Sequence, residues 1–224
     1  MITLTRRPIT PAVSARTGDT WRGSAACASV GRDAFYDGSV DGQKTARQVC
    51  VRCPVLMQCL SGTAAEEAWS QDRWGMAAGL TAPQRLALVW EERLHGARPD
   101  VTKAGQLIGW DWMRKLRHLH EQRLTLDEIT RAIGGTTPQH LVTTRLALWW
   151  LDLDGTRAQL RADGELTPKW QRVADAHGPE IARVLKAGGN RFDVSAYLGV
   201  SVSCAEKAIT FVNKSMVAAL EVAA

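Results

Sequence analysis

Apolar residues recur every three or four positions along most of this chain, which is the spacing of one face of an α-helix. The pattern predicts helices over residues 42–53 and 54–69, and another that starts at Thr81, with Thr81 as N-cap and Pro83 in the first turn. The apolar positions of this third helix share one face: Leu86, Val89, Trp90 and Leu94. Segments of alternating polarity are scarce, so we predict an all-α fold without a sheet.

The helical pattern breaks at residues 96–100, where glycine and proline interrupt it. We therefore predict a small helical domain over residues 19–95 and a second helical domain over residues 100–224. Residues 1–18 are polar, contain two prolines and show no periodicity. They are predicted to be a disordered lead.

Composition is that of an ordinary globular chain: 224 residues, 45% apolar, 23% charged, with a net charge of +5. This mildly basic balance permits a nucleic-acid partner without requiring one. The first twenty residues lack the apolar core of a signal peptide, and no segment reaches the length of a membrane span, so we expect a cytoplasmic protein without membrane contact. No P-loop, dinucleotide-binding glycine pattern or nucleophile with a positioned base is present, so neither enzyme activity nor catalytic residues are predicted.

Four cysteines carry the most specific chemistry: Cys27, Cys50, Cys53 and Cys59, spaced C-x22-C-x2-C-x5-C. Four thiolates complete the usual ligand shell of a [4Fe-4S] cluster and also that of structural zinc. Zinc ribbons usually pair two C-x2–4-C knuckles, and only one is present here. Disulfides suit secreted proteins, for which this sequence gives no sign. The spacing thus favours an iron–sulfur cluster, with zinc and disulfides as alternatives.

Helical geometry explains how three of the cysteines can meet. Cys50 and Cys53, at i and i+3, share a helical face, whereas Cys59 falls on another face of an ideal helix. Pro54 directly follows Cys53, where it ends one helix or starts the next. Two short helices with a proline corner would direct all three thiols to one point, and Cys27 would arrive from a separate segment. Nearby Arg47 and Arg52 are candidates for balancing the cluster's negative charge.

Several motifs follow one another in a familiar order over residues 19–88. Trp21 precedes the first cysteine, and an acidic–aromatic segment, Asp33-Ala34-Phe35-Tyr36, follows it before Gly38. Residues 46–59 read ARQVCVRCPVLMQC. Residues 75–81 read GMAAGLT and precede Gln84-Arg85. In this order the motifs resemble the WhiB-like family, small iron–sulfur proteins of actinobacteria and their phages.

The resemblance implies a [4Fe-4S] cluster on the four cysteines and a role in transcription. In the family, the turn corresponding to residues 75–81 carries a tryptophan and helps form the surface that meets region 4 of the principal sigma factor of RNA polymerase. Here Ala77 stands at the position of that tryptophan, and the nearest tryptophan is Trp74. By this resemblance the partner-binding residues are expected to be Trp74, Gly75, Met76, Gly79 and Leu80.

Residues 124–145 form the first of two segments with a helix–turn–helix pattern. Ile129 and Ile133 define a short helix that ends at Gly134, and a polar Thr-Thr-Pro sequence opens a second helix. If this second helix enters a DNA groove, the residues facing DNA are Gln139, His140, Thr143, Thr144 and Arg145. The alternative is a helical corner that binds nothing. The apolar run over residues 146–153 is expected to be a buried helix end or a dimer surface.

The second such segment covers residues 192–212. Leu198-Gly199-Val200-Ser201 resembles the corner common in helix–turn–helix motifs. The residues predicted to face DNA here are Ser201, Ser203, Glu206 and Lys207. Cys204, in the same helix, is expected to be a small buried residue rather than a reactive thiol.

These predictions combine into an iron–sulfur transcriptional regulator: a helical cluster domain followed by a helical domain with helix–turn–helix-like units. It would bind DNA and a sigma factor, with oxygen or nitric oxide as the expected signal. Two alternatives remain from the sequence: a zinc-stabilised interaction module without redox sensing, and a protein disulfide reductase that uses Cys50 and Cys53 in the metal-free form.

Overall fold

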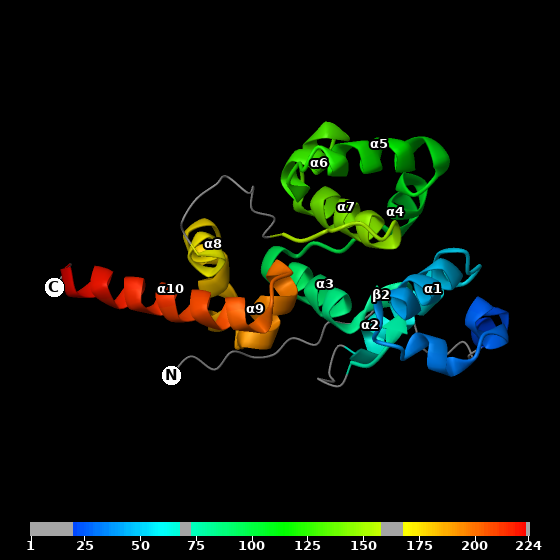
Figure 1. Cartoon of the computed structure of the whole chain (residues 1–224), viewed down its shortest axis with the longest axis horizontal. Coiled ribbons are helices and arrows are strands. Elements are labelled where there is room, and N and C mark those ends of the chain that lie inside the picture. The colour runs from blue at the N-terminus through cyan, green and yellow to red at the C-terminus, as the bar shows by residue number, and fades with distance from the viewer. Residues whose placement is uncertain (1–19, 68–72, 158–167, 223–224) are drawn as a thin grey trace.

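The computed structural model describes residues 20–67, 73–157 and 168–222 (Figure 1). The lead predicted for residues 1–18 lies outside these residues. The described part contains ten α-helices, three short 3-10 helices and one two-stranded sheet, which confirms the all-α class. None of the described helices has the length and apolar character needed to span a bilayer.

The N-terminal third starts with three 3-10 helices, η1 (Thr20–Ser24), η2 (Ala26–Ser29) and η3 (Arg32–Phe35). Helices α1 (Val40–Val51) and α2 (Leu56–Glu67) follow, close to the two predicted ranges. Strands β1 (Met76–Ala77) and β2 (Leu80–Thr81) form an antiparallel hairpin that the sequence pattern missed, because strands of two residues have no alternation to detect.

Helix α3 (Ala82–His95) begins as predicted. The Thr81 hydroxyl and the Gln84 side chain form a capping box, and Pro83 lies in the first turn. Gly96 ends the helix in the left-handed conformation, with φ of 62°. The predicted break at residues 96–100 is therefore a genuine helix end.

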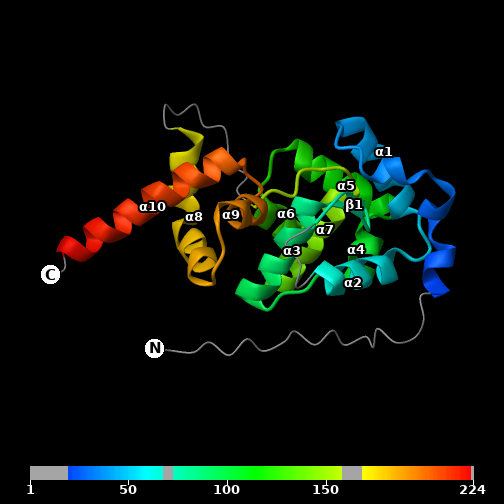
Figure 2. The ribbon, with the colours of Figure 1, turned by 90° about the horizontal axis from the view of Figure 1, so that it is seen from below.

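Helices α4 (Val101–Leu107), α5 (Trp110–Glu121), α6 (Leu126–Ala132) and α7 (Pro138–Trp150) form one group above α3 in Figure 1. Helices α8 (Lys169–Lys186), α9 (Arg191–Leu198) and α10 (Val202–Val222) form another, from which α10 projects (Figures 1 and 2). Gly199 connects α9 to α10 with φ of 75°, a conformation that glycine adopts without strain.

Two apolar cores hold these groups together, and α3 contributes to both. Ala87 belongs to a core that joins the cysteine region to α4–α7, whereas Trp90 belongs to a core shared with α8–α10. Elements from both sides of the predicted boundary at residues 96–100 therefore pack against the same helix, α3. Helix α3 is the central element that fixes the two C-terminal groups against the N-terminal third.

Candidate functional site

The corner between α1 and α2 presents three of the four cysteines. Cys50 is buried at the end of α1, and Cys53 follows it with its N–H bonded to the Cys50 carbonyl at 3.0 Å. Cys59, half-buried, lies on the first turn of α2. Pro54 lies between the helices, as the sequence analysis predicted. The proline corner places Cys59 on a separate helix, which a single straight helix could not do.

Cys27 approaches this corner from η2. The backbone N–H of its neighbour Ala26 donates a hydrogen bond to the Cys53 sulfur, with an N to Sγ distance of 3.4 Å. This contact holds the N-terminal segment against the corner. Cys27 itself remains exposed, so this side of the site is open to solvent.

The hairpin turn supplies main-chain donors to the two most enclosed thiols. Burial raises the pKa of Cys50 to about 11, a hydrogen bond from the Gly79 main chain opposes this shift, and the three other cysteines add to it. Burial also raises the pKa of Cys59, against hydrogen bonds from the Ala78 main chain and the Thr63 side chain. The mutual electrostatic effects show that all four thiols lie in one neighbourhood, and the main-chain donors favour the thiolate that metal binding requires.

The four thiols are neighbours without forming a closed ligand shell. Across residues 20–67, 73–157 and 168–222, no three Cys, His, Asp or Glu side chains converge closely enough to hold a metal ion. The donor chemistry nevertheless fits a four-thiolate centre, since four sulfurs and two directed N–H groups belong to one small region. Binding a cluster or a zinc ion would draw these side chains closer together.

Arg47 lies against this site, as expected, and Arg52 does not. The Arg47 side chain is buried three residues before Cys50, donates from Nε to the Gly79 carbonyl at 3.1 Å, and pairs with Asp152. Burial lowers its pKa, while Asp152 and Cys50 act in the opposite direction. Arg52 is exposed at the end of α1. Arg47 is therefore the cation that faces the thiols.

Trp150 in α7 and Asp152 just beyond its end complete the surroundings of the site, and neither was among the predicted site residues. The Trp150 indole N–H donates to the Ala78 carbonyl at 2.9 Å, and Asp152 holds Arg47. No local signal identified these two residues, because Trp150 lies within an apolar run and Asp152 follows it in a loop. The run over residues 146–153 packs inside the molecule at the helix end, which was one of the two expectations for it.

Arg85 fixes the hairpin from the other side. Its buried guanidinium binds the Glu67 carboxylate with both Nε and Nη2, at 2.8 to 3.0 Å. The same group donates to the main-chain carbonyls of Trp74, Gly75 and Leu80 at 2.7 to 3.1 Å. One planar cation thus satisfies three loop carbonyls and anchors the turn to α2.

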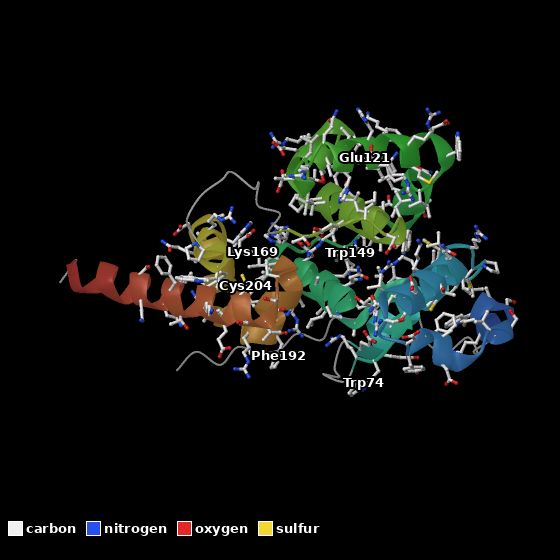
Figure 3. The ribbon with its side chains drawn as sticks, in the orientation of Figure 1. Trp74, Glu121, Trp149, Lys169, Phe192 and Cys204 are labelled. Atoms are coloured by element: carbon white, nitrogen blue, oxygen red, sulfur yellow. The ribbon has the colours of Figure 1, made fainter. Side chains whose placement is uncertain are left out.

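The predicted partner surface is only partly available. The Trp74 side chain is 75% exposed at the edge of the molecule (Figure 3), and Gly75 is half-buried beside it. Met76 and Leu80 are 8% and 0% exposed, and Gly79 is covered by Trp150. Burial therefore contradicts a direct partner contact for Met76, Gly79 and Leu80, because the hairpin uses these residues for packing.

The prediction that five residues of the first segment face DNA is wrong for three of them. Thr143, Thr144 and Arg145 are buried, and every residue of α7 from Leu141 to Trp150 belongs to the interior. Gln139 and His140 are exposed, but His140 accepts hydrogen bonds from the Thr136 and Thr137 main chain and caps the helix. Helix α7 is buried around its circumference from Leu141 onward, so it is a central core helix and this part of it cannot enter a groove.

The second segment places its predicted residues on the surface. Ser201, Ser203, Glu206 and Lys207 are exposed on the first turns of α10, and Ser201 caps the helix through the Cys204 N–H. Glu206 pairs with Arg191 of α9 at 3.0 Å. Cys204, on α10, is half-buried against the core that α10 shares with α8 and α9, and burial raises its pKa. Of the two segments, this one presents an accessible helix.

Comparison with known proteins supports the resemblance for the N-terminal third. Residues 21–88 match the family model described as transcription factor WhiB. The match runs from Trp21 into α3 and contains all four cysteines and the hairpin, while α4–α10 lie beyond it. Comparisons with curated proteins and with solved structures found no match.

Proposed function

We propose that this chain, whose residues 21–88 belong to the WhiB family of transcription factors, regulates transcription with a [4Fe-4S] cluster held by Cys27, Cys50, Cys53 and Cys59. The observation that carries the proposal is that four thiols lie in one neighbourhood around the proline corner, with main-chain donors at Ala78 and Gly79 for two of them. When bound, a cluster would supply a redox centre. Oxygen and nitric oxide are the signals that we expect.

The contacts of the N-terminal segment indicate what would happen if the cluster were lost. Segment 20–35 reaches the corner by the Ala26–Cys53 hydrogen bond and by a salt bridge between exposed Arg22 and Glu66 at 2.6 Å. Exposed ion pairs contribute about 0–1 kcal/mol. Shared ligation with Cys27 would therefore provide much of the force that holds this segment in place, and its loss would release the segment.

Iron and sulfide analysis of anaerobically purified protein tests the cluster. We expect a broad absorption band at about 400–420 nm with about four irons per chain. Cys50→Ser should lose the band, whereas Cys204→Ser, a matched change outside the corner, should retain it. A colourless protein with one zinc would replace the proposal by the zinc-stabilised module. The reductase alternative needs accessible reactive thiols, and Cys50 does not supply one because its side chain is buried.

DNA binding is the second part of the proposal, and it rests on α9 and α10. Helix α9 ends at Gly199, Ser201 caps α10, and the first turns of α10 present Ser203 and Lys207 to solvent. Helix α8 packs behind both, giving a three-helix unit in which α10 projects from the molecule (Figure 2). This arrangement suits docking of the start of α10 in a major groove. Gel-shift titration with promoter DNA tests it.

A sigma-factor contact is proposed for Trp74, the residue of the predicted partner surface that is most exposed. A tryptophan 75% exposed beside a rigid hairpin is a typical anchor for a protein interface. Trp74→Ala should reduce binding of purified sigma region 4. Trp110→Ala removes a tryptophan of similar exposure, 70%, from α5 and should not. Equal binding by both variants would contradict the proposed contact.

A further inference from the structure

The peptide group between Ala78 and Gly79 lies between Cys50 and Trp150. Its carbonyl oxygen, that of Ala78, accepts a hydrogen bond from the buried Trp150 indole. Its N–H, that of Gly79, lies beside Cys50, since a Cβ at Gly79 would be 3.5 Å from the Cys50 Cβ, and this N–H favours the Cys50 thiolate. A peptide group is planar, so Trp150, which binds its carbonyl, also fixes the direction of the Gly79 N–H. The next carbonyl of the turn, that of Gly79, accepts a hydrogen bond from buried Arg47.

Trp150 binds the first of these carbonyls. Its indole N–H donates to Ala78 O at 2.9 Å, and the ring lies so close to Gly79 that a Cβ there would be 3.1 Å from the Trp150 Cδ1 atom. Gly79 also has a φ of 74°. The turn thus takes a glycine both for its backbone conformation and for the close approach of Trp150.

Asp152 acts on the second carbonyl through Arg47. The Arg47 Nε donates to Gly79 O at 3.1 Å, and the other side of the guanidinium pairs with Asp152. Asp152 adopts a φ of 59° just after α7, and the next residue, Leu153, bonds back to the Leu148 carbonyl at 2.9 Å. The carboxylate is therefore presented by a defined helix end rather than by a free loop.

We propose that Trp150 and Asp152, which lie outside the WhiB-matched segment, are positioning residues of the four-cysteine site: Trp150 fixes the Ala78–Gly79 peptide beside Cys50, and Asp152 holds Arg47 against the next carbonyl of the same turn. The C-terminal helices thereby become part of the site. The inference rests on the four cysteines acting together, and it holds whether they bind a cluster or zinc.

Outer partners of a metal site commonly change metal affinity by about 10–100-fold when they are removed. Coupling of this kind is reciprocal. If the end of α7 stabilises the bound thiolates, then occupancy of the four cysteines stabilises the end of α7 by the same free energy. The cysteine site would then report its state directly to the helical group α4–α7.

The double variant Trp150→Phe, Asp152→Asn tests this inference in the full-length chain. Phenylalanine keeps most of the ring volume without the N–H, and asparagine tolerates the positive φ of position 152 without the charge. Trp149→Phe is the matched control, since Trp149 is equally buried and stacks on Arg145 instead of the turn. Asp152→Asn alone is the milder variant if the double variant folds poorly.

Two readouts decide the result. In metal-free protein, alkylation of each cysteine by iodoacetamide at fixed pH is followed by peptide mass spectrometry. We expect Cys50 to react about tenfold more slowly in the double variant, because loss of the fixed Gly79 N–H lowers its thiolate fraction, with Cys204 unchanged and with Trp149→Phe like the wild type. In metal-loaded protein, the lifetime of the bound metal against a chelator should fall by about the same factor.

Unchanged or faster alkylation at Cys50 would overturn the inference, and a rise shared with Cys204 would show general loosening of the fold. Alkylation does not depend on which metal the protein binds. A zinc-loaded wild type would therefore defeat the cluster proposal while leaving this test intact.

Discussion

The Glu91 carboxylate in α3 receives a hydrogen bond from the Arg145 guanidinium in α7 at 2.9 Å, and neither side chain is more than 1% exposed. Arg145 also donates to the carbonyls of Gly155 and Tyr197 at 2.8 Å, so each of its three guanidinium nitrogens has a partner. Arg157 adds a second cation to Glu91 at 3.0 Å. This buried pair joins the two apolar cores at α3.

Arg145→Ala should therefore destabilise the fold rather than remove a DNA contact. Removing one partner of a buried, hydrogen-bonded pair leaves the other charge without compensation and costs roughly 3–5 kcal/mol in the free energy of unfolding. Urea unfolding measures this change. Arg114→Ala, at an exposed site in α5 with no ion pair among the described residues, should change stability by less than about 0.5 kcal/mol. Similar small changes in both variants would contradict the role assigned to Arg145.

The environment of Glu180 in α8 predicts that the fold loses stability in acid. Burial opposes its ionisation, but the hydrogen bond from His177 and the charge and hydrogen bond of Arg157 prevail and lower the pKa to about 2, from 4.5. A carboxylate whose pKa is lower in the folded state stabilises the fold above the unfolded pKa and loses that contribution as pH falls toward the folded value. Wild-type stability should fall between about pH 4.5 and 2 more steeply than that of Glu180→Gln. Parallel curves from chemical denaturation across this range would exclude the effect.

Arg85→Lys should loosen the hairpin although the charge is kept. Lysine cannot form the fork that binds Glu67 with two nitrogens while reaching three carbonyls, so several buried acceptors lose their donors. We expect a loss of about 2–4 kcal/mol in unfolding free energy, since each unsatisfied buried group costs about 1–3 kcal/mol. Hydrogen exchange should rise in residues 75–81. Arg93→Lys, on an exposed position of the same helix, should leave exchange there unchanged.

Lys207→Ala tests the assignment of α10 to DNA. A lysine that contacts phosphate contributes about one unit to the slope of log affinity against log salt concentration. The variant should bind promoter DNA more weakly with a slope reduced by about one. Lys115→Ala, an exposed lysine in α5, provides the control. If Lys115→Ala lowered the affinity for DNA and Lys207→Ala did not, the DNA-binding surface would not lie on α10.

Sequence patterns predicted the helices and corners well where the signal is local. The Thr81–Gln84 capping box, the Gly96 helix end and the proline corner at Pro54 all depend on residues within a few positions of each other. The same local reasoning failed for α7. Its Thr-Thr-Pro opening is a true helix start, but the burial of Arg145 depends on Glu91, which is 54 residues away.

The sequence by itself determined the helical class, the four-cysteine spacing and the match of residues 21–88 to a transcription-factor family model. These features depend on residue type and short spacing. Tertiary structure alone decided that α3 belongs to two cores, that α7 is an interior helix, and that Trp150 and Asp152 hold the turn beside the cysteines. The reason is physical: burial and pairing between residues 50 to 105 positions apart follow from how helices pack, and no local pattern encodes them.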